Sequence, residues 1–181
     1  GIDIVKNKFN IKIDIDTTFK SFNIRELMID QLQRILTIMD KYNTVDTNIH
    51  VDENVPLIIY NSPQYLLQIC MNLLSNSLKF TKNGYINLNI EYDDDVNLLI
   101  IKCIDTGCGI KDKYNDTIWR PFVSIDESNR GTGLGLYSVK QKIDLLNGSI
   151  KTYNRKVGCV FECKLPILHE DFINKRLDNY N

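Results

Sequence analysis

The stretch that decides the fold runs from Ser62 to Phe80 and reads SPQYLLQICMNLLSNSLKF. It predicts a helix, because the opening serine can cap the first amides and the proline after it suits the first turn. Asn72 and Asn76 are four positions apart and share one face of this helix, with Lys79 on the turn after them and Gln68 on the turn before. An apolar line runs beside this polar stripe and consists of Leu66, Cys70, Leu73, Leu74 and Leu78.

The polar stripe offers ligands for a phosphorylated molecule. Asparagine side chains on an otherwise apolar helix are costly to desolvate unless they bind something. Amide oxygens suit Mg²⁺, which prefers oxygen donors, and Lys79 supplies a point charge for phosphate oxygens. A solvent-facing amphipathic helix would show the same pattern, so the stripe alone leaves both interpretations open.

A second motif, Asp105-Thr-Gly-Cys-Gly-Ile110, follows a predicted buried strand. Gly107 and Gly109 allow the backbone to approach a flat ligand or to adopt positive φ angles. The carboxylate of Asp105 can accept a hydrogen bond from an exocyclic amine such as that of adenine, and such a charge-assisted bond contributes about 1.5 to 3 kcal/mol. An ordinary Asp-Gly turn is the alternative interpretation.

A third motif, Gly131-Thr-Gly-Leu-Gly-Leu136, opens a predicted helix that runs to Leu146. Free backbone amides and the positive end of the helix dipole favour a triphosphate at such a place. The spacing matches neither the phosphate-binding P-loop nor the dinucleotide fingerprint. Arg130 directly precedes the motif and could reach a terminal phosphate, although an exposed loop charge is an equally good interpretation.

The composition indicates one globular domain. The chain has 181 residues, of which 43% are hydrophobic and 25% charged, and its net charge of −1 gives no field that would attract nucleic acid. No apolar run reaches the roughly 18 residues of a membrane span. The five cysteines show no CxxC spacing and favour reduced thiols in the core of a cytosolic protein, while two isolated histidines are too few for a metal site.

The remaining patterns predict an α+β fold. Asn23 and Glu26 resemble a capping box that begins a helix over 24–42, and Asn147-Gly148 closes the last helix. Alternation and turn residues predict strands, including two hairpins. Their ranges are 9–15, 48–51, 57–60, 85–92, 96–104, 149–153 and 159–165. We therefore expect a two-layer sandwich of one mixed, largely antiparallel sheet and a layer of about three helices.

In this order the motifs resemble the conserved boxes of sensor histidine kinases. The stretch 68–81 resembles their N box, 105–110 their G1 box, 118–122 their F box and 131–136 their G2 box. The segments 22–27 and 158–166 also fit the family's pattern, so the resemblance covers residues 20–166. It implies the GHKL ATP-binding fold that is shared with DNA gyrase.

The resemblance also implies roles for individual residues. Asn72 and Asn76 would hold Mg²⁺ and phosphates as catalytic residues. Arg130, from its place directly before the third motif, is the third expected catalytic residue. Residues 111–130, which have little periodicity, would form a mobile ATP lid anchored by Trp119 and Phe122. The further ATP contacts that it implies are Lys79, Phe80, Asp105, Gly107, Gly109, Ile110, Phe122, Thr132, Gly133, Leu134, Gly135 and Leu136.

One position separates the subfamilies that the resemblance covers. In gyrase-like ATPases a glutamate that activates water stands where this chain has Asn72, and an amide cannot act as a base. The site therefore resembles one that holds ATP until another nucleophile arrives. Neither His50 nor His169 lies in the context of a phospho-accepting histidine. We expect residues 1–19 to be the end of a dimerisation domain or a linker, 20–166 the catalytic domain, and 167–181 a frayed polar tail.

The expected function is transfer of the ATP γ-phosphate to a histidine on a dimerisation domain absent from the chain. The expected partners are that domain of the same protein and a downstream receiver or response regulator, with no nucleic acid. We expect a monomeric isolated domain, a homodimeric full-length protein and a cytoplasmic location, and leave membrane anchoring of the parent open. The alternatives are an ATP-sensing module without transfer and an anti-sigma-like serine kinase.

Overall fold

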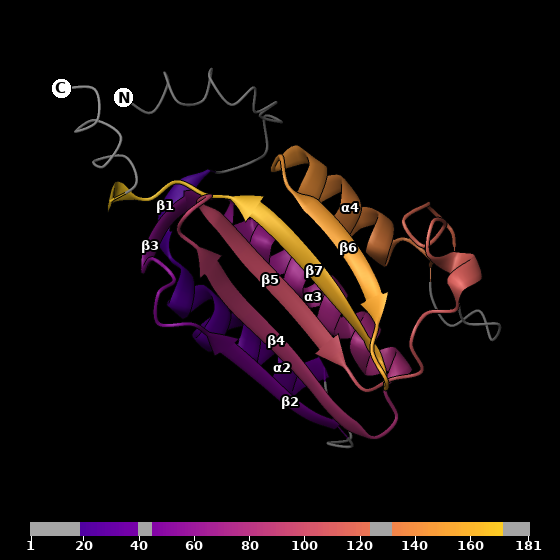
Figure 1. The fold of residues 1–181 in the computed structure, drawn as a ribbon. Coiled ribbons are helices and arrows are strands. Elements are labelled where there is room, and N and C mark those ends of the chain that lie inside the picture. Colours follow the sequence, from indigo (N-terminus) through magenta and orange to yellow (C-terminus); the bar gives the residue numbers. More distant parts are fainter. Residues whose placement is uncertain (1–18, 40–44, 124–131, 172–181) are drawn as a thin grey trace.

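The structure, a computed structural model, describes residues 19–39, 45–123 and 132–171. Its main sheet has five strands in the order β2-β4-β5-β7-β6 (Figure 1). The pair β2–β4 is parallel and the other pairs are antiparallel. The strands are β2 Val45–Val51, β4 Gly84–Asp93, β5 Leu98–Asp105, β6 Ser149–Asn154 and β7 Cys159–Pro166. Both predicted hairpins are confirmed.

Helices cover one face of this sheet, behind the strands in Figure 1. They are α3 Pro63–Phe80, α4 Gly135–Leu145 and a helical segment in which η1 Glu26–Leu32 continues into α2 Gln33–Met39. The predicted two-layer α+β sandwich is therefore confirmed. Among the described residues, no helix combines the length and the apolar composition that a membrane crossing requires.

The first helical segment differs from a regular α-helix. Asn23 caps it as predicted, because its Oδ1 accepts from the backbone N–H of Arg25 at 3.0 Å and of Glu26 at 3.2 Å. Over η1 the backbone is a π-helix, which has more residues per turn than an α-helix. Met28 and Leu32 are buried there. The predicted last residues, 40–42, lie outside the described residues.

Helix α3 begins and ends where the sequence predicts. The Ser62 hydroxyl accepts from the Tyr65 backbone N–H at 3.3 Å, and the Thr81 N–H closes the last turn on the Ser77 carbonyl at 2.9 Å. The predicted apolar line packs on the core, with Leu66, Cys70, Leu73 and Leu74 buried. Leu78 is half-buried, and the polar Ser77 takes the core position on the last turn.

Helix α4 ends in a Schellman motif formed by the predicted Asn147-Gly148 pair. Asn147 adopts a left-handed φ of 56°, and the Gly148 N–H reaches back to the Ile143 carbonyl at 2.9 Å. Gly148 serves another purpose, since a Cβ there would lie 2.5 Å from the Lys164 carbonyl oxygen of β7. The asparagine therefore turns the chain, and the glycine lets it pass close to the sheet.

The segment after β7 corrects the predicted tail. A second, two-stranded sheet pairs β1 Lys20–Asn23 with β3 Ile58–Asn61, and Leu168 extends it, because its carbonyl accepts from the Tyr60 N–H at 2.7 Å. Ile167 is 2% exposed, and His169 Nε2 lies 2.7 Å from the Tyr92 hydroxyl. Residues 167–169 are thus packed on the domain. The predicted strand 9–15 and the rest of the tail, 172–181, lie outside the described residues.

Candidate nucleotide-binding site

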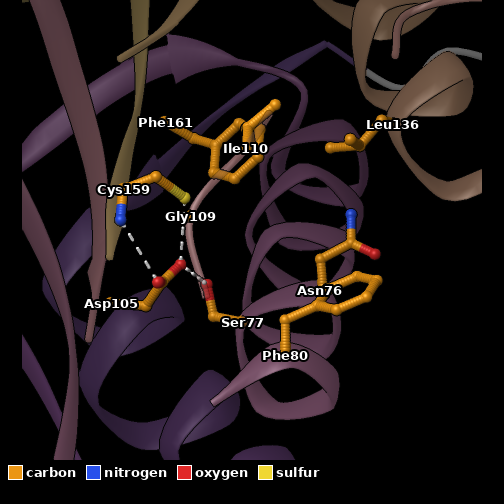
Figure 2. A pocket seen from close by; sticks show the side chains of 9 residues that line it. All are labelled: Asn76, Ser77, Phe80, Asp105, Gly109, Ile110, Leu136, Cys159 and Phe161. Atoms are coloured by element: carbon orange, nitrogen blue, oxygen red, sulfur yellow. Dashed lines mark hydrogen bonds between the residues drawn. The ribbon is translucent and has the colours of Figure 1, made fainter. Parts of the chain in front are cut away.

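A pocket opens between α3, the turn after β5, the start of α4 and the start of β7 (Figure 2). Six of its lining residues are among those predicted to contact ATP, namely Asn76, Phe80, Asp105, Gly109, Ile110 and Leu136. Sequence reasoning missed the other three, which are Ser77, Cys159 and Phe161. The pocket therefore combines the predicted motifs with residues that only the fold brings to them.

Asp105, at the end of β5, is only 3% exposed and is held by four donors. Its Oδ1 accepts from the backbone N–H of Gly107 at 2.9 Å and of Cys159 at 3.4 Å. Its Oδ2 accepts from the Ser77 hydroxyl at 3.1 Å and the Cys159 thiol at 3.4 Å. A buried carboxylate needs such donors, and they fix its orientation toward the pocket. The thiol is the weakest of them.

Of the two glycines after Asp105, Gly109 adopts the predicted positive φ, whereas Gly107 makes its close approach to the protein backbone. Gly107 passes Phe80 so closely that a Cβ would lie 2.6 Å from the Phe80 carbonyl oxygen. Gly109 has a φ of 69°, in the left-handed region that glycine favours. The turn from Gly107 to Ile110 therefore depends on its glycines for its shape, and this shape forms one wall of the pocket.

The missed residues carried only weak signals in the sequence. Ser77 follows Leu73 by one helical turn, so it was a polar residue at a core position of the apolar line. Cys159 opens a predicted strand directly after Gly158, and nothing local connects it with Asp105. Their approach depends on the register of β7 against β5, in which Ile104 pairs with Val160.

Two thiols of this network stay protonated. Burial, and then the nearby Asp105, raise the pKa of Cys159 far above its ordinary value, so the thiol remains a donor. Burial also raises the pKa of Cys103 to about 12, although its contact with the Ser77 hydroxyl, at 3.4 Å, acts in the opposite direction. All five cysteines are free, and only Cys108 is exposed.

We expect iodoacetamide to alkylate Cys108 first in the native protein. The other four thiols, including Cys159 and Cys103, should react at least about tenfold more slowly at pH 7.5, because only the thiolate is the nucleophile. Raising the pH to 9 should leave these four slow, since burial keeps their pKa values high. Peptide mass spectrometry would measure the rates, with urea-unfolded protein as the control. Equal rates for Cys159 and Cys108 would contradict the network.

The side chains expected to contact phosphates lie where α3 meets the start of α4. A methyl group on Gly135 would lie 3.9 Å from Asn72 Oδ1 and 4.0 Å from Asn76 Nδ2, so both amides face the first turn of α4. No side chain among the described residues caps that turn, which leaves its backbone N–H groups available to an anion. Amide oxygens beside such a turn are a donor set that suits Mg²⁺ and phosphates.

Lys79 and Gln68, at the two ends of the polar stripe, are exposed. The Lys79 ammonium lies 4.9 Å from the centre of the Phe80 ring at the rim of the pocket. In the third motif, Thr132 is exposed and its hydroxyl accepts from the Leu134 N–H at 3.4 Å, at the entry to α4. Arg130 and Gly131 lie outside the described residues.

The described part of the expected lid, residues 111–123, contains a 3-10 turn, η2 Asp112–Tyr114, and a buried anchor. Ile118 is 2% exposed, and Trp119 packs edge-to-face on Phe161 with ring centres 6.1 Å apart. The expectation that the Phe122 side chain anchors the lid was wrong, because that side chain is 78% exposed.

The backbone of Phe122 makes the contact instead. Its N–H donates to the Gly133 carbonyl at 3.0 Å, and its φ is 64°. Gly133 has a φ of 66°, and a Cβ there would lie 2.7 Å from the carbonyl carbon of Phe122. This close backbone pairing joins the described part of the lid to the start of α4.

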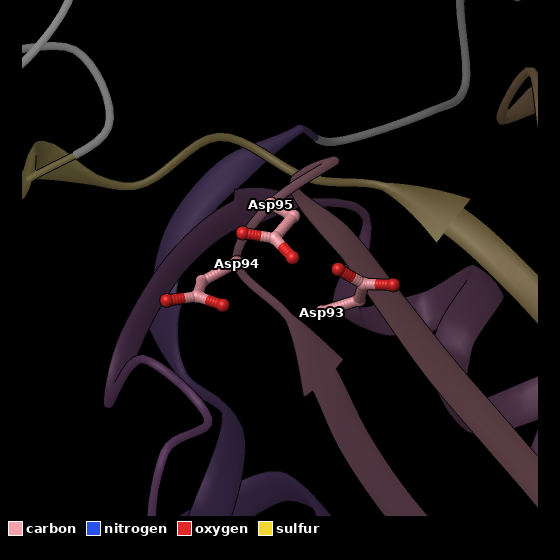
Figure 3. Close-up of side chains that lie close together, drawn as sticks. All are labelled: Asp93, Asp94 and Asp95. Carbon is pink, nitrogen blue, oxygen red and sulfur yellow. The ribbon is translucent and has the colours of Figure 1, made fainter.

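Three aspartates form a separate acidic cluster (Figure 3). Carboxylate oxygens of Asp93, Asp94 and Asp95 lie within 4.8 Å of one another. The cluster occupies the opposite end of the β4–β5 hairpin from Asp105, because Asp93 pairs with Leu98 at that end. Its clearest effect is electrostatic, since burial first and then Asp94 and Asp93 raise the pKa of Tyr92. The nucleotide pocket is therefore a separate site.

Comparison with known families decides the identity of the domain. A family model described as histidine kinase-, DNA gyrase B-, and HSP90-like ATPase matches residues 61–169. The chain belongs to this ATPase family. The matched range includes Asp105 and the packed residues 167–169.

Similar proteins point to one branch of this ATPase family. Hybrid signal transduction histidine kinase B of Dictyostelium discoideum is 34% identical over 147 residues, which are 77% of this chain and 8% of that protein. The catalytic domain of histidine kinase ThkA aligns with 82% of this chain and 95% of its own, at a TM-score of 0.71 and 26% identity. The structure of full-length ShkA in complex with AMPPNP shares the fold, with a TM-score of 0.76, 21% identity, and coverage of 93% of this chain and 36% of that one. The domain is an ATP-binding catalytic domain of the histidine kinase type.

Proposed function

We propose that this ATPase-family domain transfers the γ-phosphate of ATP to a histidine on a dimerisation domain outside the chain. The observation that carries the proposal is the pair of amides, Asn72 and Asn76, that faces the start of α4. An amide cannot take a proton from water, so no general base stands at the Asn72 position. Such a site positions ATP and neutralises its charge while the nucleophile comes from elsewhere.

The donor set fits a magnesium ion. Asn72 and Asn76 would hold Mg²⁺ through their amide oxygens, and Lys79 would contact phosphate oxygens. The bound ion would supply charge neutralisation at the phosphates. The uncapped first turn of α4, from Gly135 onward, would bind phosphate oxygens through backbone N–H groups. Arg130 remains our proposed contact to the terminal phosphate.

The partners and the domain organisation are also proposals. The names of hybrid and sensor kinases among the relatives support a histidine-bearing dimerisation domain and a receiver as partners. We place the end of that dimerisation domain or a linker in residues 1–19 and the catalytic domain from residue 20 onward, in the cytoplasm. The packing of residues 167–169 extends the domain beyond the expected end at residue 166. A monomeric isolated domain and a homodimeric full-length protein complete the proposal.

We expect the isolated chain to hydrolyse ATP slowly and to leave His50 and His169 unlabelled. Supplied in trans, the native dimerisation domain should acquire acid-labile label from [γ-³²P]ATP, because its histidine provides the nucleophile that this site lacks. Electrophoresis and acid treatment would measure the transfer. Tight ATP binding without any transfer would favour an ATP-sensing module, and acid-stable phosphoserine on a partner would favour a serine kinase. Stable label on either histidine would contradict the proposal directly.

A further inference from the structure

The side chain of Asn154, the last residue of β6, holds the backbone of Ile110 at two points. Its Oδ1 accepts from the Ile110 N–H at 2.9 Å, and its Nδ2 donates to the Ile110 carbonyl at 2.7 Å. Because the Ile110 N–H needs an acceptor and the Ile110 carbonyl needs a donor, the positions of the oxygen and nitrogen in the Asn154 amide are determined. Among the described residues, no other group bonds to the Ile110 backbone.

Ile110 is a junction between the ATP pocket and the lid. It is 6% exposed and lines the pocket, and Lys111, the first residue of the lid, follows it. The preceding Gly109 passes so close that a Cβ there would lie 3.0 Å from Asn154 Oδ1. One side chain at the end of β6 thus holds both the wall of the pocket and the point where the lid begins.

We propose that Asn154 is a positioning residue for ATP, acting through the Ile110 backbone. The Asn154 amide satisfies the backbone N–H and C=O of Ile110 as a neighbouring strand would, because it offers one acceptor and one donor. Without it, the N–H and C=O of a buried residue would have no protein partner, and the wall would move toward water. The inference rests on the proposed ATP site, because its readouts are ATP affinity and lid packing.

Protonation of an aspartate at this position gives a sharp test. In Asn154→Asp, an ionised carboxylate could still accept from the Ile110 N–H, but it would place a second acceptor against the Ile110 carbonyl. Protonation would restore a donor at that point, and the unfavourable contact raises the pKa of the new side chain. We expect ATP affinity about tenfold below wild type at pH 7.5 and within about threefold of it at pH 5. Asn154→Ala should bind ATP weakly at both pH values.

Controls separate this effect from general acid sensitivity. Calorimetry of the wild type at both pH values gives the baseline, and Asn48→Asp makes the same substitution at an exposed position on β2, at the other edge of the sheet. Asn48→Asp should bind ATP like the wild type at both pH values. Emission from Trp119, the only tryptophan, should change on adding ATP in the wild type and respond less in Asn154→Ala.

The outcomes distinguish the inference from the proposed function. If the wild type does not bind ATP, the proposed function fails. If the wild type binds ATP and both Asn154 variants bind ATP as tightly as the wild type at both pH values, the positioning role is overturned. If circular dichroism shows that Asn154→Ala is unfolded, the test rests on Asn154→Asp alone. Its ATP affinity should then recover between pH 7.5 and pH 5. Weak binding by Asn154→Asp that does not recover at pH 5 also overturns the inference.

Discussion

Replacing Asp105 by Asn should weaken ATP binding by tenfold or more. The carboxylate is 3% exposed and accepts hydrogen bonds from Ser77, Gly107 and Cys159. An amide in its place would turn its own N–H₂ toward some of those donors and would give adenine a weaker, neutral acceptor. Loss of a charge-assisted bond of about 1.5 to 3 kcal/mol corresponds to about ten- to a hundredfold in affinity.

Calorimetry with ATP and GTP would test this prediction. The wild type should prefer ATP, because the carboxylate accepts from the adenine amine and would repel the carbonyl that guanine has in its place. Asp46→Asn, at an exposed position on β2, makes the same change away from the pocket and should leave the affinity unchanged. Thermal melting should show both variants folded at the measuring temperature. Equal affinity of the wild type for ATP and GTP would show that Asp105 does not read the base.

Replacing Asn76 by Ala should reduce phosphotransfer on the order of a hundredfold or more, in line with the loss of one group that stabilises developing charge. Asn76 lines the pocket, and its Nδ2 faces Gly135 at the start of α4. Its amide therefore lies where we propose that Mg²⁺ and the phosphates bind. The affinity for ATP without Mg²⁺ should change far less than the rate of transfer, because base recognition by Asp105 remains.

Gln68→Ala is the matched control for Asn76→Ala. Gln68 belongs to the same polar stripe of α3, but it is exposed and lies two turns before Asn76. Its replacement should leave transfer within about twofold of wild type, as expected for a surface position. The measurement is the initial rate of label transfer to the dimerisation domain across a Mg²⁺ titration. A wild-type rate and an unchanged Mg²⁺ dependence in Asn76→Ala would contradict the magnesium assignment.

Local patterns predicted much of the fold and part of the site. The bounds of α3 follow from Ser62 and Pro63, which act on the amides directly beside them. The hairpins follow from alternation and turn residues, because side chains on a strand alternate between its faces. Six lining residues of the pocket came from the motifs, and of these Phe80, Ile110 and Leu136 were implied only by the resemblance to histidine kinases. Each of these signals involves neighbours in the chain.

The sequence by itself thus determined α3, α4, the two hairpins, the motifs of the proposed ATP site and the likeness to histidine kinases, but it did not predict β1 or the π-helical η1. Tertiary structure alone decided which residues distant in the sequence complete the pocket. Cys159 reaches Asp105 across 54 positions, and Asn154 reaches Ile110 across 44, because β7 lies between β5 and β6 in the sheet. The exposure of Phe122 and the packing of residues 167–169 likewise depend on non-local pairing. Such contacts carry no local periodicity, since strand order and register arise only when the whole sheet assembles.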